Sequence, residues 1–481
     1  MTDAPTPLLV DLLTELRSAV GDTHVLTDPA DLAAYDTDWR GAYSGRPLAV
    51  VRPGSTAEVA AVLAATHAAG VAVVPQGGNT GMSGGAVPDD SGSQVILSLG
   101  RMRAVREVDA VGGTITVESG CVLADVQAAA AGVDRLFPLT LGSQGSCTIG
   151  GNISTNAGGT AVLRYGMMRS QVLGLEVVLP DGRVWDGLRS LRKDNTGYDL
   201  KQLFIGAEGT LGVVTAAVLT IQPATPSRAT AWVALRDVAA AAELLGVLRD
   251  HGGDRLTTWE LVSRPARDLV VAAGLTDPLS TSSEWYGLVE LAGPAGADVA
   301  TPLEAALGEA VEAGLVLDAA IAGSPAQRSG LWALRERVSE AQEVHGPTVK
   351  HDVSVPITAL ADFVARTGPA IEAHLPGTRL FVYGHVGDGN LHYNLSRPEH
   401  LTSEEFLTHA AALSDVVNAS VAELTGSISA EHGLGKSKAA AAAAYKSDVE
   451  VALMRAVKDA IDPAGLMNPG AVLPLPPVLL G

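Results

Sequence analysis

Residues 142–159 read GSQGSCTIGGNISTNAGG, and this stretch decides the fold together with three other glycine-rich loops. The other loops are PQGGNTGMSGG (75–85), GAEGTLGV (206–213) and NPG (468–470), and we expect each at the end of a strand. Glycine lets backbone N–H groups approach a ligand closely and point together, which is how a loop holds a pyrophosphate. One Gly-Gly pair is most often an ordinary turn. Several such loops with Ser, Thr and Asn in one domain indicate a large ligand.

The chain around these loops predicts an α+β fold. Apolar runs bounded by turn residues predict strands or hairpins at 48–53, 71–76, 94–99, 104–120 and 172–187. Ser55 and Glu58 form a capping box that opens a helix running to Gly70. Residues 8–20 predict a helix that stops at Gly21.

The residue composition and the pattern of predicted strands and helices change at two places in the chain, and these changes predict the domain boundaries. The segment IQPATP (221–226) reads as a linker, after which strands alternate with longer Ala/Leu helices. We expect domains at 1–225 and 226–420, followed by a helical C-terminal segment at 421–481.

Two familiar nucleotide-binding motifs are absent from the sequence. The GxGxxG spacing of a Rossmann fold does not occur. Gly435-Lys436-Ser437 resembles the end of a P-loop, but the first glycine of that motif would stand where the sequence has Ala430. The predicted ligand is therefore held in another way.

Composition excludes several classes of protein. The 481 residues are enough for two or three domains, and 47% hydrophobic with 18% charged residues indicates a globular chain. A net charge of −20 argues against nucleic acid and anionic membranes as partners. Cys121 and Cys147 form no CxxC pair, which argues against a disulfide framework or a zinc site built from cysteines. No apolar run is long enough for a membrane span, and no targeting segment is visible. We therefore expect a cytoplasmic protein without a membrane span.

Two histidines flank a glycine turn in FVYGHVGDGNLHYNL (381–395). A hairpin here would bring His385 and His392 close together, although an isolated histidine is most often structural or exposed. Glu431 and His432 precede a second glycine turn. Two histidines and one carboxylate leave a tetrahedral zinc ion an open position, as in catalytic sites. Mn²⁺, Co²⁺ or Fe²⁺ fits similar ligands, and the sequence alone leaves open whether Glu431 meets the histidines.

A cationic stretch follows at LWALRERVSEA (331–341) and VKHDVSVP (349–356). Arg335 and Ser339 are four residues apart and share one helix face, and Lys350 comes shortly after. The alternative is a solvated helix face whose charges pair locally, which is the usual role of such runs.

The motifs PQGGNTG, GSCTIGGNISTNAGG and GAEGTLGVVT, in this order, resemble the FAD-binding domain of the vanillyl-alcohol oxidase / p-cresol methylhydroxylase superfamily. The segment DPAGLMNPG (462–470) is similar to the one that returns to the flavin in the branch of D-lactate, glycolate and D-2-hydroxyglutarate dehydrogenases. The resemblance covers about residues 30–470. It implies a two-region FAD-binding domain of the p-cresol methylhydroxylase type, an α+β substrate (cap) domain with an antiparallel sheet, and an active site between them.

The resemblance also implies which residues bind FAD. They are Gln76, Gly77, Gly78, Asn79, Thr80, Gly81, Met82, Gly142, Ser143, Ser146, Thr148, Gly151, Thr155, Asn156, Gly158, Glu208, Gly209, Val213 and Asn468. Some relatives attach FAD covalently through a histidine in the first loop. Asn79 stands there in this sequence and cannot form the bond, so we expect non-covalent FAD.

The segments GHVGDGNLHYN and EHG resemble the metal-binding segments of the hydroxyglutarate branch. The resemblance implies His385, His392 and Glu431 as ligands of a divalent metal, zinc above all, and His432 as the catalytic base. It implies that Arg335, Ser339 and Lys350 bind the substrate carboxylate and that Asn394 joins them. Threonine is usual at the position of Ser339, and serine keeps the hydroxyl. The lactate and glycolate branch usually reads DVCVP without the lysine, so KHDVSVP favours a dicarboxylate.

The implied reaction is oxidation of D-2-hydroxyglutarate, or of a related acid such as D-malate, to the 2-oxo acid with FAD as electron acceptor. A D-lactate or glycolate dehydrogenase or oxidase is the alternative enzyme, and a non-catalytic flavin-binding carrier is the alternative from another class. The carrier leaves the histidine hairpin and the cations unexplained. An electron-transferring flavoprotein or a quinone fits as the next electron acceptor, and the family suggests a homodimer.

Overall fold

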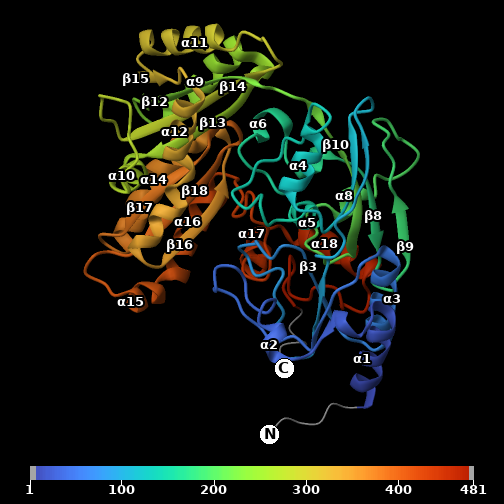
Figure 1. The fold of residues 1–481 in the computed structure, drawn as a ribbon. Coiled ribbons are helices and arrows are strands. Elements are labelled where there is room, and N and C mark those ends of the chain that lie inside the picture. The colour runs from blue at the N-terminus through green and yellow to red at the C-terminus, as the bar shows by residue number, and fades with distance from the viewer. Residues whose placement is uncertain (1–6, 476–481) are drawn as a thin grey trace. The chain divides into compact units, whose positions relative to one another are not determined.

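The computed structural model describes residues 7–475 and divides them into two compact units (Figure 1). Unit 1 combines the described residues up to Gly158 with Met167–Pro223 and residues 431–475. Unit 2 combines Gly159–Gly166 with Ala224–Ala430. The chain leaves unit 1 inside the predicted linker 221–226. Residues 421–430, which we expected at the start of the C-terminal segment, pack with unit 2. No helix among the described residues is long and apolar enough to cross a membrane.

Unit 1 contains two main sheets. The first has the order β1-β2-β4-β3, in which β4 pairs in parallel with β2 and β3, and β1 pairs antiparallel with β2. The second is antiparallel with the order β5-β6-β10-β8-β9. The strands are β1 Val25–Leu26, β2 Ala49–Val51, β3 Val73–Gln76, β4 Val95–Ser98, β5 Val105–Asp109, β6 Thr114–Glu118, β8 Val172–Val178, β9 Val184–Gly187 and β10 Val213–Thr220, with a separate pair β7 Arg135–Leu136 and β11 Gln222–Pro223. Both predicted hairpins are present, as β5–β6 and β8–β9.

Unit 1 also contains nine helices among the described residues. They are α1 Pro7–Val20, α2 Pro29–Leu32, α3 Thr56–Ala68, α4 Leu123–Ala131, α5 Ile149–Ser154, α7 Met168–Gln171, α8 Lys201–Phe204, α17 Ala439–Tyr445 and α18 Asp448–Ile461, with a 3-10 turn at Asp22–His24. Helix α3 begins as predicted, because Ser55 accepts the N–H of Glu58. The Glu58 carboxylate returns to the N–H of Gly54 and not to that of Ser55, so the capping box is shifted by one residue. Each sheet has its own buried core.

Unit 2 is built on a seven-stranded antiparallel sheet with the order β15-β12-β14-β13-β17-β18-β16. The strands are β12 Ser227–Leu235, β13 Leu256–Ser263, β14 Trp285–Gly293, β15 Val316–Ile321, β16 Thr348–Ser354, β17 Arg379–His385 and β18 Asn390–Ser396. The helices are α6 Val162–Tyr165, α9 Val238–Gly252, α10 Arg264–Ala272, α11 Ala300–Glu312, α12 Pro325–Glu336, α13 Val338–Ala341, α14 Leu360–His374, α15 Ser403–Thr408 and α16 Ala410–Glu423. The 3-10 turns are η2 Gly253–Arg255, η3 Gln342–His345, η4 Ile357–Ala359 and η5 Val386–Asp388.

Each face of this sheet has its own core, because successive side chains of a strand point to opposite faces. Trp259 and Leu261 of β13 belong to the larger core, which also holds residues of α9, α11, α14 and α16. Val262 belongs to a smaller core with α10, α12 and α13. The sheet is thus covered by helices on both faces, and the α+β class with an antiparallel second sheet is confirmed.

Candidate functional site

Strand register gathers polar side chains on one face of the unit 2 sheet. Lys350 lies opposite Asn394, and Asp352 lies opposite His392. Tyr383 lies opposite the same His392, and Glu260 lies opposite His385. Residues that face one another across adjacent strands point to the same side of the sheet. These six polar residues and Tyr383, drawn from β13, β17, β18 and β16, form what we call the polar face.

The predicted histidine hairpin is present as β17, the 3-10 turn η5 and β18. Gly389 closes the turn with φ +77°, and a Cβ there would lie 2.1 Å from the carbonyl oxygen of Val355. Both facts require glycine at this position. The ring centroids of His385 and His392 are 5.8 Å apart. The hairpin therefore does bring the two predicted ligands together.

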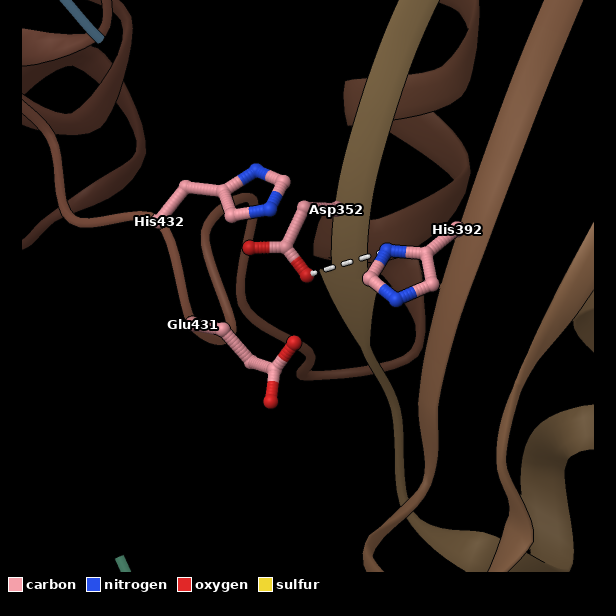
Figure 2. A group of neighbouring side chains, drawn as sticks. All are labelled: Asp352, His392, Glu431 and His432. Carbon is pink, nitrogen blue, oxygen red and sulfur yellow. Dashed lines mark ion pairs between the residues drawn. The ribbon is translucent and has the colours of Figure 1, made fainter. Parts of the chain in front are cut away.

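Figure 2 shows a group of four possible metal ligands, Asp352, His392, Glu431 and His432, whose side chains point toward one another. One ligand atom from each lies within 4.8 Å of all the others. Asp352 Oδ1 is 3.8 Å from His392 Nδ1 and accepts a hydrogen bond of 2.8 Å from Asn390. The ligand atoms of one metal ion with bonds of about 2.1 Å lie at most about 4.2 Å apart, so small side-chain movements suffice for a shared ion.

Chain connectivity explains why Glu431 and His432 join residues of the sheet. Ser427 exchanges two backbone hydrogen bonds with Ser354 at the end of β16. The N–H of Ala430 then donates to the carbonyl oxygen of Asp352 over 3.1 Å. The next residue along the chain is Glu431. Two of the three predicted ligands and the predicted base thus meet, and Asp352 is an addition that the sequence analysis missed.

His385 stands outside this group of four and is tied to a different carboxylate. Its Nδ1 lies 2.5 Å from Oε1 of Glu260. The other oxygen of Glu260 accepts a hydrogen bond of 2.6 Å from Nε of Arg335. Burial by itself would raise the pKa of Glu260, but the neighbouring charges and hydrogen bonds of His385 and Arg335 outweigh it and lower the pKa. Glu260 therefore stays ionised between its two partners.

Three of the four predicted substrate-binding residues contact Tyr383. Its hydroxyl lies 2.7 Å from Ser339 Oγ and accepts from Asn394 Nδ2 over 3.2 Å. The guanidinium carbon of Arg335 lies 4.8 Å from the centre of the Tyr383 ring. Burial raises the pKa of Tyr383, so the phenol stays protonated. Arg335 is buried, which excludes the alternative of a solvated helix face at this residue.

Two of the predicted cofactor loops of unit 1 lie against each other. A Cβ at Gly78 would lie 2.1 Å from the carbonyl oxygen of Ser146, and one at Gly77 would lie 2.3 Å from Oγ1 of Thr148. Both side-chain donors of Gln76 are used by the carbonyl oxygens of Tyr35 and Ala86. The side chain of Gln76 therefore braces the first loop.

Backbone strain gathers at the predicted cofactor residues. Seven non-glycine residues between 7 and 475 have a positive φ, and four of them were predicted to bind FAD. These four are Asn79, Asn156, Glu208 and Asn468. Such conformations are costly for residues other than glycine and cluster at ligand sites. Oγ1 of Thr148 and Oδ1 of Asn468 are also buried acceptors without a protein partner, as expected where a ligand supplies the donor.

Glu208 has a role that sequence reasoning missed. Its two carboxylate oxygens accept the backbone N–H groups of Leu434 and Gly435, at 2.7 and 2.8 Å. Its carbonyl oxygen accepts from Nδ2 of Asn468 over 2.8 Å. Burial raises the pKa of the Glu208 carboxyl against the lowering effect of the two N–H groups. Glu208 thus fixes the loop that follows Glu431 and His432.

Comparisons with known proteins agree with the predicted family. Residues 47–187 match the family described as FAD binding domain, and residues 224–472 match the family described as FAD linked oxidases, C-terminal domain. The chain resembles p-cresol methylhydroxylase with substrate bound at a TM-score of 0.77 and 18% identity, over 98% of each chain. That likeness confirms the predicted fold type.

Curated relatives match over nearly the whole chain. The Bos taurus protein named "D-2-hydroxyglutarate dehydrogenase, mitochondrial" is 41% identical over 94% of this chain and 81% of its own length. The Oryza sativa subsp. japonica protein named "Probable D-2-hydroxyglutarate dehydrogenase, mitochondrial" is 40% identical over 96% and 82%. The Xanthomonas citri pv. viticola protein named "D-2-hydroxyglutarate dehydrogenase" is 38% identical over 95% of each chain.

Proposed function

This chain belongs to the FAD-linked oxidases, and we propose that it oxidises D-2-hydroxyglutarate, or a closely related D-2-hydroxy dicarboxylate, to the 2-oxo acid. The observation that carries the proposal is the polar face of unit 2. Three of the predicted substrate-binding residues converge there on Tyr383, next to the predicted metal ligand His392. The relatives named D-2-hydroxyglutarate dehydrogenase are similar along nearly the whole chain and support the same substrate.

The residues of unit 1 fit FAD. Gly77 and Gly78 leave no room for side chains against the second loop, and a bound flavin nucleotide would give the unpartnered oxygens of Thr148 and Asn468 hydrogen-bond donors. We assign the predicted cofactor residues to FAD on this basis. When bound, FAD supplies the two-electron acceptor for the hydrogen at C2 of the substrate.

The residues of the polar face would hold the substrate. Arg335 and Lys350 supply positive charge for a carboxylate that lies away from C2, and Ser339 adds a hydroxyl donor. Asn394 donates to Gln342 and Tyr383, so it would act by positioning the Tyr383 hydroxyl. A guanidinium binds a carboxylate through two parallel N–H groups, which fixes the direction of the substrate as well as its charge. The two cations suit a dicarboxylate better than lactate or glycolate.

The group in Figure 2 fits a divalent metal, because imidazole and carboxylate are a mixed donor set that zinc accepts. From this group we assign His392 and Glu431 as ligands, and Asp352 is available beside them. We assign His385, which lies outside the group, as the third ligand on the basis of the resemblance. A bound divalent ion would supply positive charge that lowers the pKa of the C2 hydroxyl. His432 would accept the hydroxyl proton as general base, the role that histidine fills most often in enzymes.

Several further properties belong to the same proposal. We propose zinc as the metal, which metal analysis of the purified protein tests. An electron-transferring flavoprotein or a quinone would take the electrons, and reduction of each by the substrate-reduced enzyme distinguishes them. A homodimer and a cytoplasmic location complete the proposal, and light scattering and cell fractionation test them.

The experiment that tests the function is anaerobic mixing of the yellow protein with D-2-hydroxyglutarate, D-malate and D-lactate in turn, following the visible flavin absorbance. We expect rapid bleaching by the five-carbon dicarboxylate and slow or no bleaching by lactate. Rapid bleaching by lactate alone would reject the dicarboxylate assignment. No bleaching by any of the three would reject the substrate class and favour a flavin-binding carrier.

A further inference from the structure

Glu260 is a buried carboxylate to which none of the roles above has been assigned. It lies on β13, and none of its surface is exposed. Its two oxygens are divided between two partners from distant parts of the chain. One contacts Nδ1 of His385 at 2.5 Å, and the other accepts from Nε of Arg335 at 2.6 Å.

We infer that Glu260 is a positioning residue that orients both His385 and Arg335, so that metal binding and carboxylate recognition depend on one side chain. The inference rests on the proposed function, which makes His385 a metal ligand and Arg335 a substrate-binding residue. Glu260 itself touches neither ligand in this scheme. It acts through the two residues that it holds.

The contact with His385 selects one form of the imidazole ring. Nδ1 of His385 lies 2.5 Å from Oε1 of Glu260, and in such a pair the ring N–H donates to the carboxylate oxygen. In the neutral ring the lone pair is then on Nε2, which becomes the metal-binding atom. Metal-binding histidines generally donate their other ring N–H to a carboxylate or carbonyl in this way, and loss of such a partner typically weakens metal binding about 10–100-fold.

The contact with Arg335 sets the direction of the guanidinium. Glu260 occupies Nε, and the ring of Tyr383 lies against the guanidinium at 4.8 Å. Glu260 thus holds the edge of the guanidinium group and Tyr383 covers one of its faces, which together fix its plane. The N–H groups of the two terminal nitrogens can still donate to a carboxylate. A lysine has a single terminal nitrogen and could not serve both Glu260 and a bidentate ligand.

The neighbouring strand offers a matched control. Glu290 on β14 is equally buried, with 1% of its surface exposed. Its carboxylate accepts from Arg228, from Arg328 and from the indole N–H of Trp332. Arg328 and Arg335 are both on helix α12, so Glu290 holds the same helix through a similar buried ion pair but does not contact His385.

The test compares Glu260→Gln with Glu290→Gln in the full-length flavoprotein. Affinity for Zn²⁺ is measured by titrating metal-depleted protein with the metal alone, and affinity for 2-oxoglutarate by perturbation of the oxidised flavin spectrum. Glutamine keeps one acceptor oxygen and presents N–H groups in place of the other. At least one of His385 and Arg335 therefore loses its hydrogen bond to residue 260. We expect Glu260→Gln to weaken Zn²⁺ binding about 10–100-fold and 2-oxoglutarate binding at least about tenfold, as for an ionic hydrogen bond. Glu290→Gln should lower the melting temperature and leave Zn²⁺ binding within twofold of wild type.

If Glu260→Gln does not yield folded protein, Glu260→Asp serves, because it keeps the charge but is too short to reach both partners. Suppose that D-2-hydroxyglutarate bleaches the flavin of the wild-type protein, and that the Glu260 variant binds Zn²⁺ and 2-oxoglutarate at least as tightly as Glu290→Gln does. This result would overturn the inference and leave the proposed function standing. Failure of the wild type to be reduced by any 2-hydroxy acid would overturn the proposed function. The Zn²⁺ titration contains no substrate, so it tests the His385 contact independently of that outcome.

Discussion

Glu208→Gln should loosen the loop that carries His432 without changing the fold of unit 1. Glu208 holds this loop by accepting the N–H groups of Leu434 and Gly435 at 2.7 and 2.8 Å. A hydrogen bond to an ionised group contributes about 1.5–3 kcal/mol, and a buried donor left without a partner costs a similar amount. Glutamine keeps one acceptor oxygen, so one bond is lost and the other becomes neutral. We expect the free energy of local opening to fall by about 2–3 kcal/mol.

A decrease of this size corresponds to roughly 30–150-fold faster amide hydrogen exchange at residues 434 and 435. We also expect flavin reduction by substrate to slow at least about tenfold, because a displacement of a catalytic group by about 1 Å is enough to slow a reaction by this much. Mass-spectrometric hydrogen exchange and anaerobic stopped-flow measure the two effects. The flavin-to-protein absorbance ratio shows whether FAD has been lost as well.

Asp462→Asn is the matched control for this variant. Asp462 is also a buried carboxylate of unit 1, and it accepts the N–H groups of Leu466 and Met467. It differs from Glu208 in also pairing with Lys458. Its replacement should accelerate exchange at 466–467 and leave 434–435 unchanged. The reasoning would be refuted if Glu208→Gln showed unchanged amide hydrogen exchange at residues 434–435, a full complement of FAD and a wild-type rate of flavin reduction.

Four other predictions follow from the site. Tyr383→Phe removes the hydroxyl that contacts Ser339 and Asn394, so steady-state kinetics should show KM for D-2-hydroxyglutarate rising about tenfold; an unchanged KM would mean that these contacts do not position substrate-binding groups. Lys350→Ala should reduce kcat/KM for D-2-hydroxyglutarate far more than for D-lactate, and equal losses would reject the distal-carboxylate role. His432→Gln should abolish bleaching while Zn²⁺ content stays at the wild-type level, and loss of Zn²⁺ would make His432 a ligand and not the base. Acid precipitation should release FAD into the supernatant because Asn79 cannot form the covalent bond, and a yellow pellet would contradict this.

Local sequence signals account for the features that were predicted correctly. The turn Gly387-Asp388-Gly389 lies between two short apolar strands, so the histidine hairpin follows from neighbouring residues alone. The glycine-rich loops likewise carry their own signature, and the structure places strain at Asn79, Asn156 and Asn468. Each of these features depends on residues close together in the sequence.

The roles and partners that were missed depend on contacts between distant parts of the chain. Glu260 is one charge in a strand of otherwise apolar and neutral residues, and its partners Arg335 and His385 are 75 and 125 residues away. The partners of Glu208 are 226 and 227 residues away. No spacing rule links such positions. Asp352 could have been found, because the two-residue period of a strand places it on the same side as Lys350.

The eight residues Gly159–Gly166 have a consequence for how this protein can be dissected. The residues before and after them in the sequence belong to unit 1, but these eight residues pack with unit 2. Thr258 donates a hydrogen bond to the carbonyl oxygen of Thr160, and Arg164 donates one to the carbonyl oxygen of Ala292. Leu163 packs against the larger core of the sheet. A fragment that begins at Ala224 would be synthesised without this piece and would expose apolar surface of its core to water. An autonomous version of the second unit therefore has to be expressed with residues 159–166 grafted back. Cleavage in the linker 221–226 would leave residues 159–166 covalently attached to unit 1.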